Sequence, residues 1–124
     1  MNEAAATKTD TVDRVRAVAA AALDRKALDL KILDLSGVSD FTDYFIVCSG
    51  GSDRQVRAIA DHVEECLREQ GVRPLHSEGR ELGRWVLLDY GDLLLHVFDQ
   101  ETREFYQLER LWSDAADVTA ELGA

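Results

Sequence analysis

Apolar residues recur every three or four positions in two long stretches of the chain, a spacing that places them on one face of an α-helix. The first stretch runs from about Thr11 to Lys26 and follows Asp10, a residue type that caps helix N-termini. The second follows Ser52 and ends near Gly71, where glycine suits the position just past a helix. The pattern therefore predicts two amphipathic helices.

Shorter apolar segments predict strands. Residues 28–32 alternate between apolar and charged types, which predicts a half-buried strand. Residues 44–48 are apolar throughout, which is typical of a central strand covered on both faces. A third strand is expected at residues 72–77, where Pro74 favours a sheet edge.

Two further apolar segments flank a turn in the stretch from residue 85 to residue 98. The tetrad at residues 89–92, Asp-Tyr-Gly-Asp, is rich in turn formers, so its flanks are expected to pair as a tight hairpin. Val86 and Leu88 suit the core, and alternation then places Trp85 on the outer face or edge.

A helical segment in one or two pieces is expected from residue 99 to about residue 112, with Phe105, Leu108 and Leu111 on an inward face. The resulting order α-β-β-α-β-β-β-α predicts a single α/β domain, a mixed sheet of about five strands flanked by helices. We divide the chain into a flexible leader (residues 1–10), the domain (residues 11–115) and an acidic tail (residues 116–124).

Composition and charge narrow the range of partners. The 124 residues carry a formal net charge of −10, which repels free nucleic acid and anionic membranes and attracts a basic protein.

No apolar run approaches the roughly 18 residues of a membrane span. The two cysteines, Cys48 and Cys66, make no disulfide framework and are expected to be buried free thiols. We therefore expect a cytoplasmic protein, for which acidity alone could serve solubility.

Candidate enzyme chemistry is weak. The pair Gly50-Gly51 joins a strand to a helix N-terminus, a natural anion site that superficially resembles the turn of nucleotidyltransferases. That chemistry needs paired carboxylates on the next strand to hold magnesium, and residues 72–77 contain none. A nucleotide-binding enzyme remains an alternative, and its candidate residues would be Ser52, Asp53 and one of Asp89 and Asp92.

Metal and nucleophile sites are not indicated either. His62 and Cys66 are four residues apart on a predicted helix, but two ligands do not make a zinc site. No serine sits in a G-x-S-x-G turn. We expect no metal, no cofactor and no catalytic residues.

Aromatic and acidic residues gather at the hairpin and the segment after it. Each aromatic ring alone could simply complete a core, but together they suit a contact surface for a basic protein. The candidate contact residues are Trp85, Asp89, Tyr90, Asp92, Arg103, Tyr106 and Glu109.

Six segments follow one another in a recognisable order: Asp43–Gly50, Ser52–Ala60, Glu78–Gly79, Trp85–Asp92, His96–Phe98 and Arg103–Trp112. Together they resemble the ribosomal silencing factor (Iojap-related) family over roughly residues 12–115. The resemblance implies a domain similar in topology to nucleotidyltransferases but without their catalytic acids. It also implies a homodimer when free, and no enzyme activity.

The function implied by the resemblance is translational repression. Members of the family bind the large ribosomal subunit through its basic protein uL-fourteen and block joining of the small subunit, which lowers translation when nutrients are scarce. A dimeric adaptor for some other protein remains a further alternative.

Overall fold

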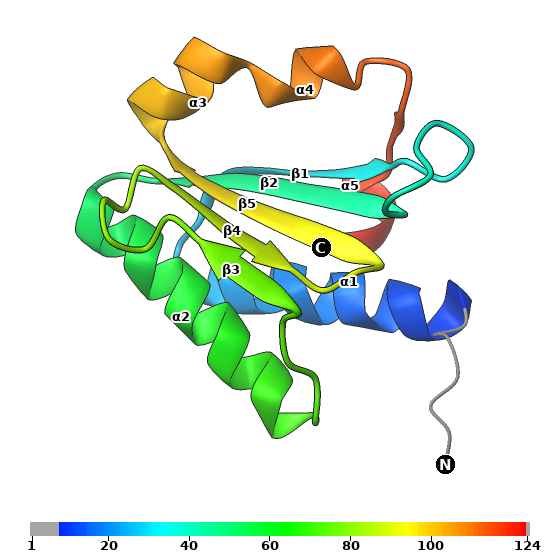
Figure 1. Cartoon of the computed structure of the whole chain (residues 1–124), viewed down its shortest axis with the longest axis horizontal. Coiled ribbons are helices and arrows are strands. Elements are labelled where there is room, and N and C mark those ends of the chain that lie inside the picture. Colours follow the sequence, from blue (N-terminus) through cyan, green and yellow to red (C-terminus); the bar gives the residue numbers. More distant parts are fainter. Residues whose placement is uncertain (1–7, 124) are drawn as a thin grey trace.

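Two long helices pack on one face of a sheet, and two short helices cover part of the other face (Figure 1). The structure is a computed structural model and describes residues 8–123. Helices α1 (Lys8–Asp24) and α2 (Asp53–Glu69) form the first layer. Helices α3 (Gln100–Tyr106) and α4 (Leu108–Leu111) lie on the opposite side. None of the helices within the described range is long and apolar enough to cross a membrane.

The sheet in the described part of the chain has six strands in the order β3-β4-β5-β2-β1-β6. Strands β2 and β5 are parallel, and every other neighbouring pair is antiparallel. The strands are β1 (Leu28–Asp34), β2 (Tyr44–Gly50), β3 (His76–Glu78), β4 (Trp85–Asp89), β5 (Leu93–Asp99) and β6 (Ala116–Asp117). The predicted mixed α/β domain is confirmed, with six strands in place of about five.

Strand β2 explains why the sheet is covered on both sides. All seven of its residues are buried, as the uninterrupted apolar run predicts. Its residues contribute to two separate apolar layers, one against α1 and α2 and one against α3 and α4. The second layer is the smaller, and its buried members are Leu33, Leu35, Phe45, Val47, Phe98 and Leu108.

The predicted hairpin is confirmed between β4 and β5. The Tyr90 N–H donates to the Leu93 carbonyl over 2.9 Å, and Gly91 has a φ of +87° that glycine adopts without strain. Val86 and Leu88 are fully buried against the helices, as expected.

The C-terminal residues differ from the expected acidic tail at 116–124. Strand β6 pairs antiparallel with β1, and helix α5 (Thr119–Leu122) follows it. Val118 and Leu122 pack against the core, so a few apolar side chains and the free edge of β1 are enough to hold this segment. Of the expected leader at residues 1–10, residues 8–10 begin α1 and the rest lies outside the described residues.

Other boundaries shift by a few residues. The expected edge strand at residues 72–77 begins only at His76, after Pro74. The C-terminal helical segment is broken at Gln107, which has a left-handed φ of +48°. That break changes the helical phase, so Leu108 is buried as expected while Phe105 and Leu111 are exposed.

The loop between β3 and β4, residues 79–84, is clamped against α2. Gly79 has a φ of +92°, and a Cβ atom there would lie 1.9 Å from the Trp85 carbonyl oxygen. The Arg80 guanidinium pairs with the carboxylates of Asp61 and Glu64 on α2. This loop therefore has a defined position beside the end of β4.

Replacing Gly79 with alanine should be far more costly than replacing Gly37. Gly37 has a similar φ of +82°, but a Cβ atom there would meet no atom of residues 8–123 within 4 Å. We expect Gly37→Ala to lower the free energy of unfolding by about 1 kcal/mol through backbone strain alone. Gly79→Ala adds a backbone clash and should cost about 3 kcal/mol. Denaturant unfolding measures both, and equal losses would contradict the clash.

Candidate functional site

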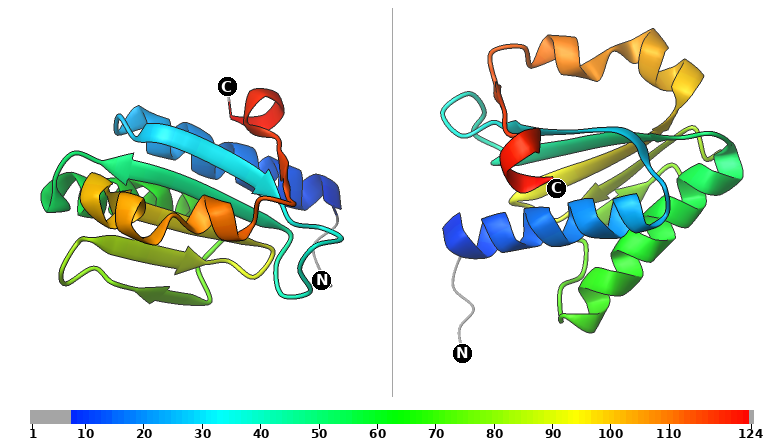
Figure 2. Two further views of the ribbon diagram at one scale, coloured as in Figure 1. Left: turned by 90° about the horizontal axis from the view of Figure 1, so that it is seen from above. Right: turned by 180° about the vertical axis from the view of Figure 1, so that it is seen from behind.

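One part of the sheet surface is not covered by any helix within the described residues. Helices α3 and α4 lie over β2 and β5, and strands β4 and β3 extend beyond them (Figure 2). On this side β4 presents Trp85, Leu87 and Asp89, which are half-buried, and α3 presents the exposed rings of Phe105 and Tyr106. We call these five residues the β4–α3 face.

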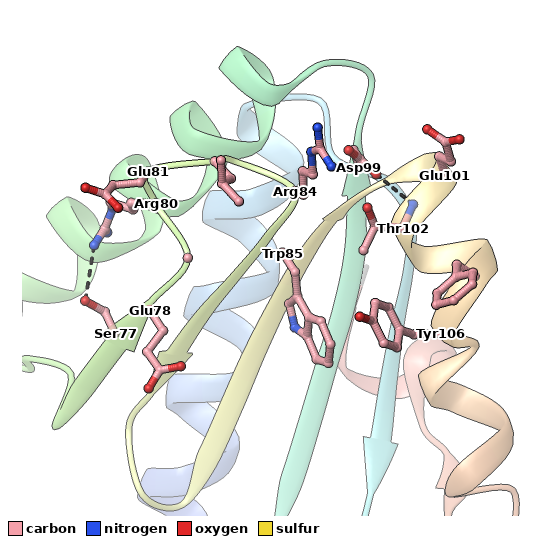
Figure 3. A pocket seen from close by; sticks show the side chains of 13 residues that line it. Ser77, Glu78, Arg80, Glu81, Arg84, Trp85, Asp99, Glu101, Thr102 and Tyr106 are labelled. Carbon is pink, nitrogen blue, oxygen red and sulfur yellow. Dashed lines mark hydrogen bonds between the residues drawn. The ribbon is translucent and has the colours of Figure 1, made fainter.

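A cleft of about 890 Å³ opens at one end of the β4–α3 face, between the loop at 79–84 and α3 (Figure 3). The rings of Trp85 and Tyr106 face each other across its floor with centroids 5.0 Å apart. Two apolar side chains on its rim are strongly exposed: Leu82 keeps 70% of its surface accessible and Phe105 keeps 79%. Exposed apolar groups gathered around a cleft are typical of a binding surface.

The charges around the cleft are predominantly negative. Its carboxylates are Glu78, Glu81, Asp99 and Glu101, and its cations are Arg80 and Arg84. The charge of Arg80 is already balanced by two carboxylates of α2. The cleft therefore favours a basic group, which the aromatic rings could also contact through cation–π interactions.

Arg103 and Glu109, two of the expected contact residues, hold the elbow between α3 and α4. The Arg103 guanidinium donates to the Glu109 carboxylate over 2.8 and 3.1 Å and to the Ser49 hydroxyl over 2.9 Å. Partial burial raises the pKa of Glu109, but the hydrogen bonds from Arg103 and from the backbone, together with the charges of Arg103 and Lys31, hold that pKa below its usual value. Both residues position α3 beside β4.

Tyr90 and Asp92 lie on the other side of the sheet, away from the β4–α3 face. Tyr90 is only 8% exposed and packs in the core against α1 and α2, where burial and then Glu64 raise its pKa to about 12. The Asp92 carboxylate is held by the Arg14 guanidinium and the Thr11 hydroxyl of α1. The structure thus places Trp85 beside Tyr106 and Asp89 at the other end of the same face of β4. The exposure expected of Tyr90 and Asp92 is not found.

Sequence reasoning missed Leu87, Phe105 and His96. Leu87 shares the alternation that places Trp85 on the outer face, so that pattern already contained its position. Phe105 was expected inside because the helix break at Gln107 has no clear sequence signal. His96 contacts Trp85 from the neighbouring strand β5.

His96 lies buried within the second apolar layer, beside Trp85. Its Nδ1 accepts a hydrogen bond from the Trp85 indole N–H over 3.1 Å, and its ring is 4.6 Å from that of Phe45. Burial lowers the pKa of His96 to about 4, against a smaller opposing effect of Glu109. The imidazole is therefore neutral at pH 7, as a hydrogen-bond acceptor must be.

The possible anion site at Gly50-Gly51 is occupied by the protein itself. The Gly51 N–H donates to the Gln55 side-chain oxygen over 2.6 Å, and the Ser52 hydroxyl accepts from the Gln55 N–H over 3.1 Å. The Gln55 amide also donates to carbonyls at the end of α1. Backbone groups that could hold a phosphate are thus used to join α2 to α1.

Other chemistry has little basis in the geometry. Burial raises the pKa of the Cys48 thiol to about 12, which suppresses the reactive thiolate. Cys66 is half-buried and lies 3.5 Å from His62 Nε2. Across residues 8–123, no three histidine, cysteine or acidic side chains are grouped so that they could hold a metal ion.

Comparison with known proteins identifies the family. A family model described as ribosomal silencing factor during starvation matches residues 8–123. The chain belongs to this family. A relative from Bacillus subtilis, named ribosomal silencing factor RsfS, is 41% identical over 109 residues, which is 88% of this chain and 92% of that protein.

Structural comparison agrees with the family assignment. A crystal structure of a Chromobacterium violaceum protein superposes with a TM-score of 0.78 at 39% identity, covering 82% of this chain and 86% of that one.

A mouse protein named mitochondrial assembly of ribosomal large subunit protein 1 is 30% identical over 90 residues, which is 70% of this chain and 40% of that protein. The names of these silencing factors describe a regulatory role and not an enzymatic one.

The buried imidazole of His96 should make stability depend on pH. Its folded pKa of about 4 lies below the ordinary value of 6.5, so between these values only the unfolded chain gains the proton. The free energy of unfolding should therefore fall as pH falls, by about 2 kcal/mol between pH 6.5 and about pH 5.

The variant His96→Leu isolates this contribution from that of the carboxylates. Urea unfolding of both proteins across this pH range should show a shallower loss in the variant. Parallel pH dependences would contradict the assignment to His96.

Proposed function

We propose that this chain binds the large ribosomal subunit and keeps the small subunit from joining it by occupying part of the joining surface. Membership of the ribosomal silencing factor family supports the general role, that of a ribosome-associated regulator of translation. The name of the mouse relative supports the large subunit as the binding partner. In this proposal the contact is the basic protein uL-fourteen, and the outcome is lower translation under nutrient limitation.

The observation that carries the proposal is the β4–α3 face. Phe105 and Tyr106 expose apolar rings next to a cleft whose carboxylates outnumber its cations. A basic protein presents the complementary charge and could bury these rings on binding. The overall charge of −10 would speed the encounter, and the aromatic contacts would slow dissociation.

The mechanism we propose is steric and involves no chemical step. A bound domain of this size prevents close approach of a second large surface wherever it sits on the joining face. The free protein is proposed to be a homodimer, on the basis of the family resemblance, and to be cytoplasmic, on the basis of its composition. The proposed contacts are Trp85, Asp89, Phe105 and Tyr106, while Arg103 and Glu109 position α3 for them.

Phe105→Ser should weaken association with purified large subunits by about tenfold, as expected for one apolar side chain at an interface. Leu75→Ser is a matched control, because Leu75 is 77% exposed and lies beside β3 outside the cleft. Co-sedimentation measures association, and light scattering on mixing subunits measures joining. Equal effects of the two variants would place the contact elsewhere.

The two aspartates of the hairpin should behave differently. Asp89→Lys reverses a charge on the β4–α3 face and should weaken large-subunit association by about fivefold, most strongly at low salt. Asp92→Asn weakens the bond to Arg14 and should lower the free energy of unfolding by about 2 kcal/mol, with association unchanged at a temperature where the variant is folded. Loss of association in folded Asp92→Asn would extend the contact to the α1 side.

A further inference from the structure

His96 is a polar residue in an otherwise apolar layer. It is 5% exposed, and the side chains that surround it on this face of the sheet include Phe45, Phe98 and Val47. A leucine of similar size would fill the same space without the cost of burying an imidazole. Burial of this imidazole therefore costs folding free energy, and the packing of the layer alone does not explain why a histidine is present.

The hydrogen bond to Trp85 determines how the imidazole is protonated. An indole N–H can only donate, so Nδ1 of His96 must be the accepting nitrogen and Nε2 must carry the proton. Nε2 is buried and has no hydrogen-bond partner among the described residues. The imidazole is thus retained with one nitrogen satisfied and the other unsatisfied.

The hydrogen-bonded nitrogen of His96, Nδ1, is the one that contacts Trp85 of the β4–α3 face. The indole of Trp85 contacts the ring of Phe98, with centroids 4.7 Å apart, and the ring of Tyr106, with centroids 5.0 Å apart. These ring contacts restrain the plane of the indole but do not determine which edge faces inward. The bond to His96 does, because it points the N–H edge toward β5.

We propose that His96 is a positioning residue that fixes the orientation of the Trp85 indole and so prepares the β4–α3 face for its partner. The expected effect on partner binding rests on the proposed function, whereas the orientation of the indole by His96 does not. An indole held in one orientation loses little conformational freedom on binding, which favours affinity.

The first test measures the indole directly. Trp85 and Trp112 are the two tryptophans of the chain, so Trp112→Phe assigns the Trp85 indole N–H in a nitrogen-15 spectrum. His96→Leu should speed exchange of this proton with solvent by about fivefold or more, as expected for loss of one hydrogen bond. His96→Asn places an amide oxygen near the position of Nδ1 and should retain slow exchange.

The second test measures large-subunit association of the same variants. His96→Leu removes the unsatisfied Nε2 and should leave the unfolding midpoint unchanged or higher, yet weaken association by about fivefold. His96→Asn is smaller and should lower the midpoint, yet keep association within about twofold of the parent. A purely structural role predicts the opposite ranking, in which association follows stability.

Leu33→Ala is the control for stability alone, because Leu33 belongs to the same layer but lies on β1, two strands away from His96. It should lower the midpoint without changing indole exchange or association. Slow exchange in His96→Leu, or equal loss of association in both His96 variants, would overturn the proposal. If the parent protein itself does not bind large subunits, the proposed function fails while the exchange measurement still decides the role of His96.

Discussion

The sheet is too wide for the helices that cover its second face. Neighbouring strands are about 4.8 Å apart and a helix with its side chains is about 10 Å wide, so one row of helices covers about two strands. On the first face two helices of 17 residues lie side by side, but on the second α3 and α4 follow each other in a single row. The row lies over β2 and β5, and the outer surface of β4 is left open beside it.

This mismatch explains several features of the β4–α3 face together. Trp85 and Leu87 stay half-buried because they stand at the border of the covered region. The Arg103–Glu109 pair has to fix the elbow between α3 and α4, because helices of seven and four residues have little stability of their own. The break at Gln107 turns Leu108 toward the sheet and leaves Phe105 facing solvent. A surface suited to a partner is thus a consequence of incomplete coverage.

The elements that could be predicted from sequence are those fixed by local patterns. The apolar run of β2, the start of α2 directly after Ser52 and the Gly91 turn each depend on neighbours within a few residues, and each was found as expected. Features that depend on distant contacts could not be predicted in the same way. Asp92 looked like a free acid at a hairpin tip, but its partners Thr11 and Arg14 are about 80 residues away in sequence.

The residues of the candidate site also differ in whether local patterns or distant contacts determine their positions. Trp85 and Asp89 were placed correctly because strand alternation is a local rule, whereas Tyr90 sits in the turn, where alternation ends and burial is set by the packing of α1 and α2. Strand β6, which residues 116–117 add at the sheet edge, also depends on a distant contact, because the free edge of β1 and not the acidic segment itself determines that it pairs there.

The open surface also explains why a polar group is tolerated inside the second layer. A side chain at the border of a covered region contacts solvent or a partner on one side, so packing restrains it less than it restrains a core residue. A directional bond can supply the missing restraint, because a hydrogen bond depends on angle whereas apolar contact does not. The imidazole of His96 is buried beneath Trp85, where its Nδ1 can accept such a bond from the indole. Only its Nε2 is left without a hydrogen-bond partner among the described residues, so the free-energy cost of burial comes from that nitrogen. Incomplete helix coverage creates the surface, and the buried acceptor beneath it gives that surface a defined shape.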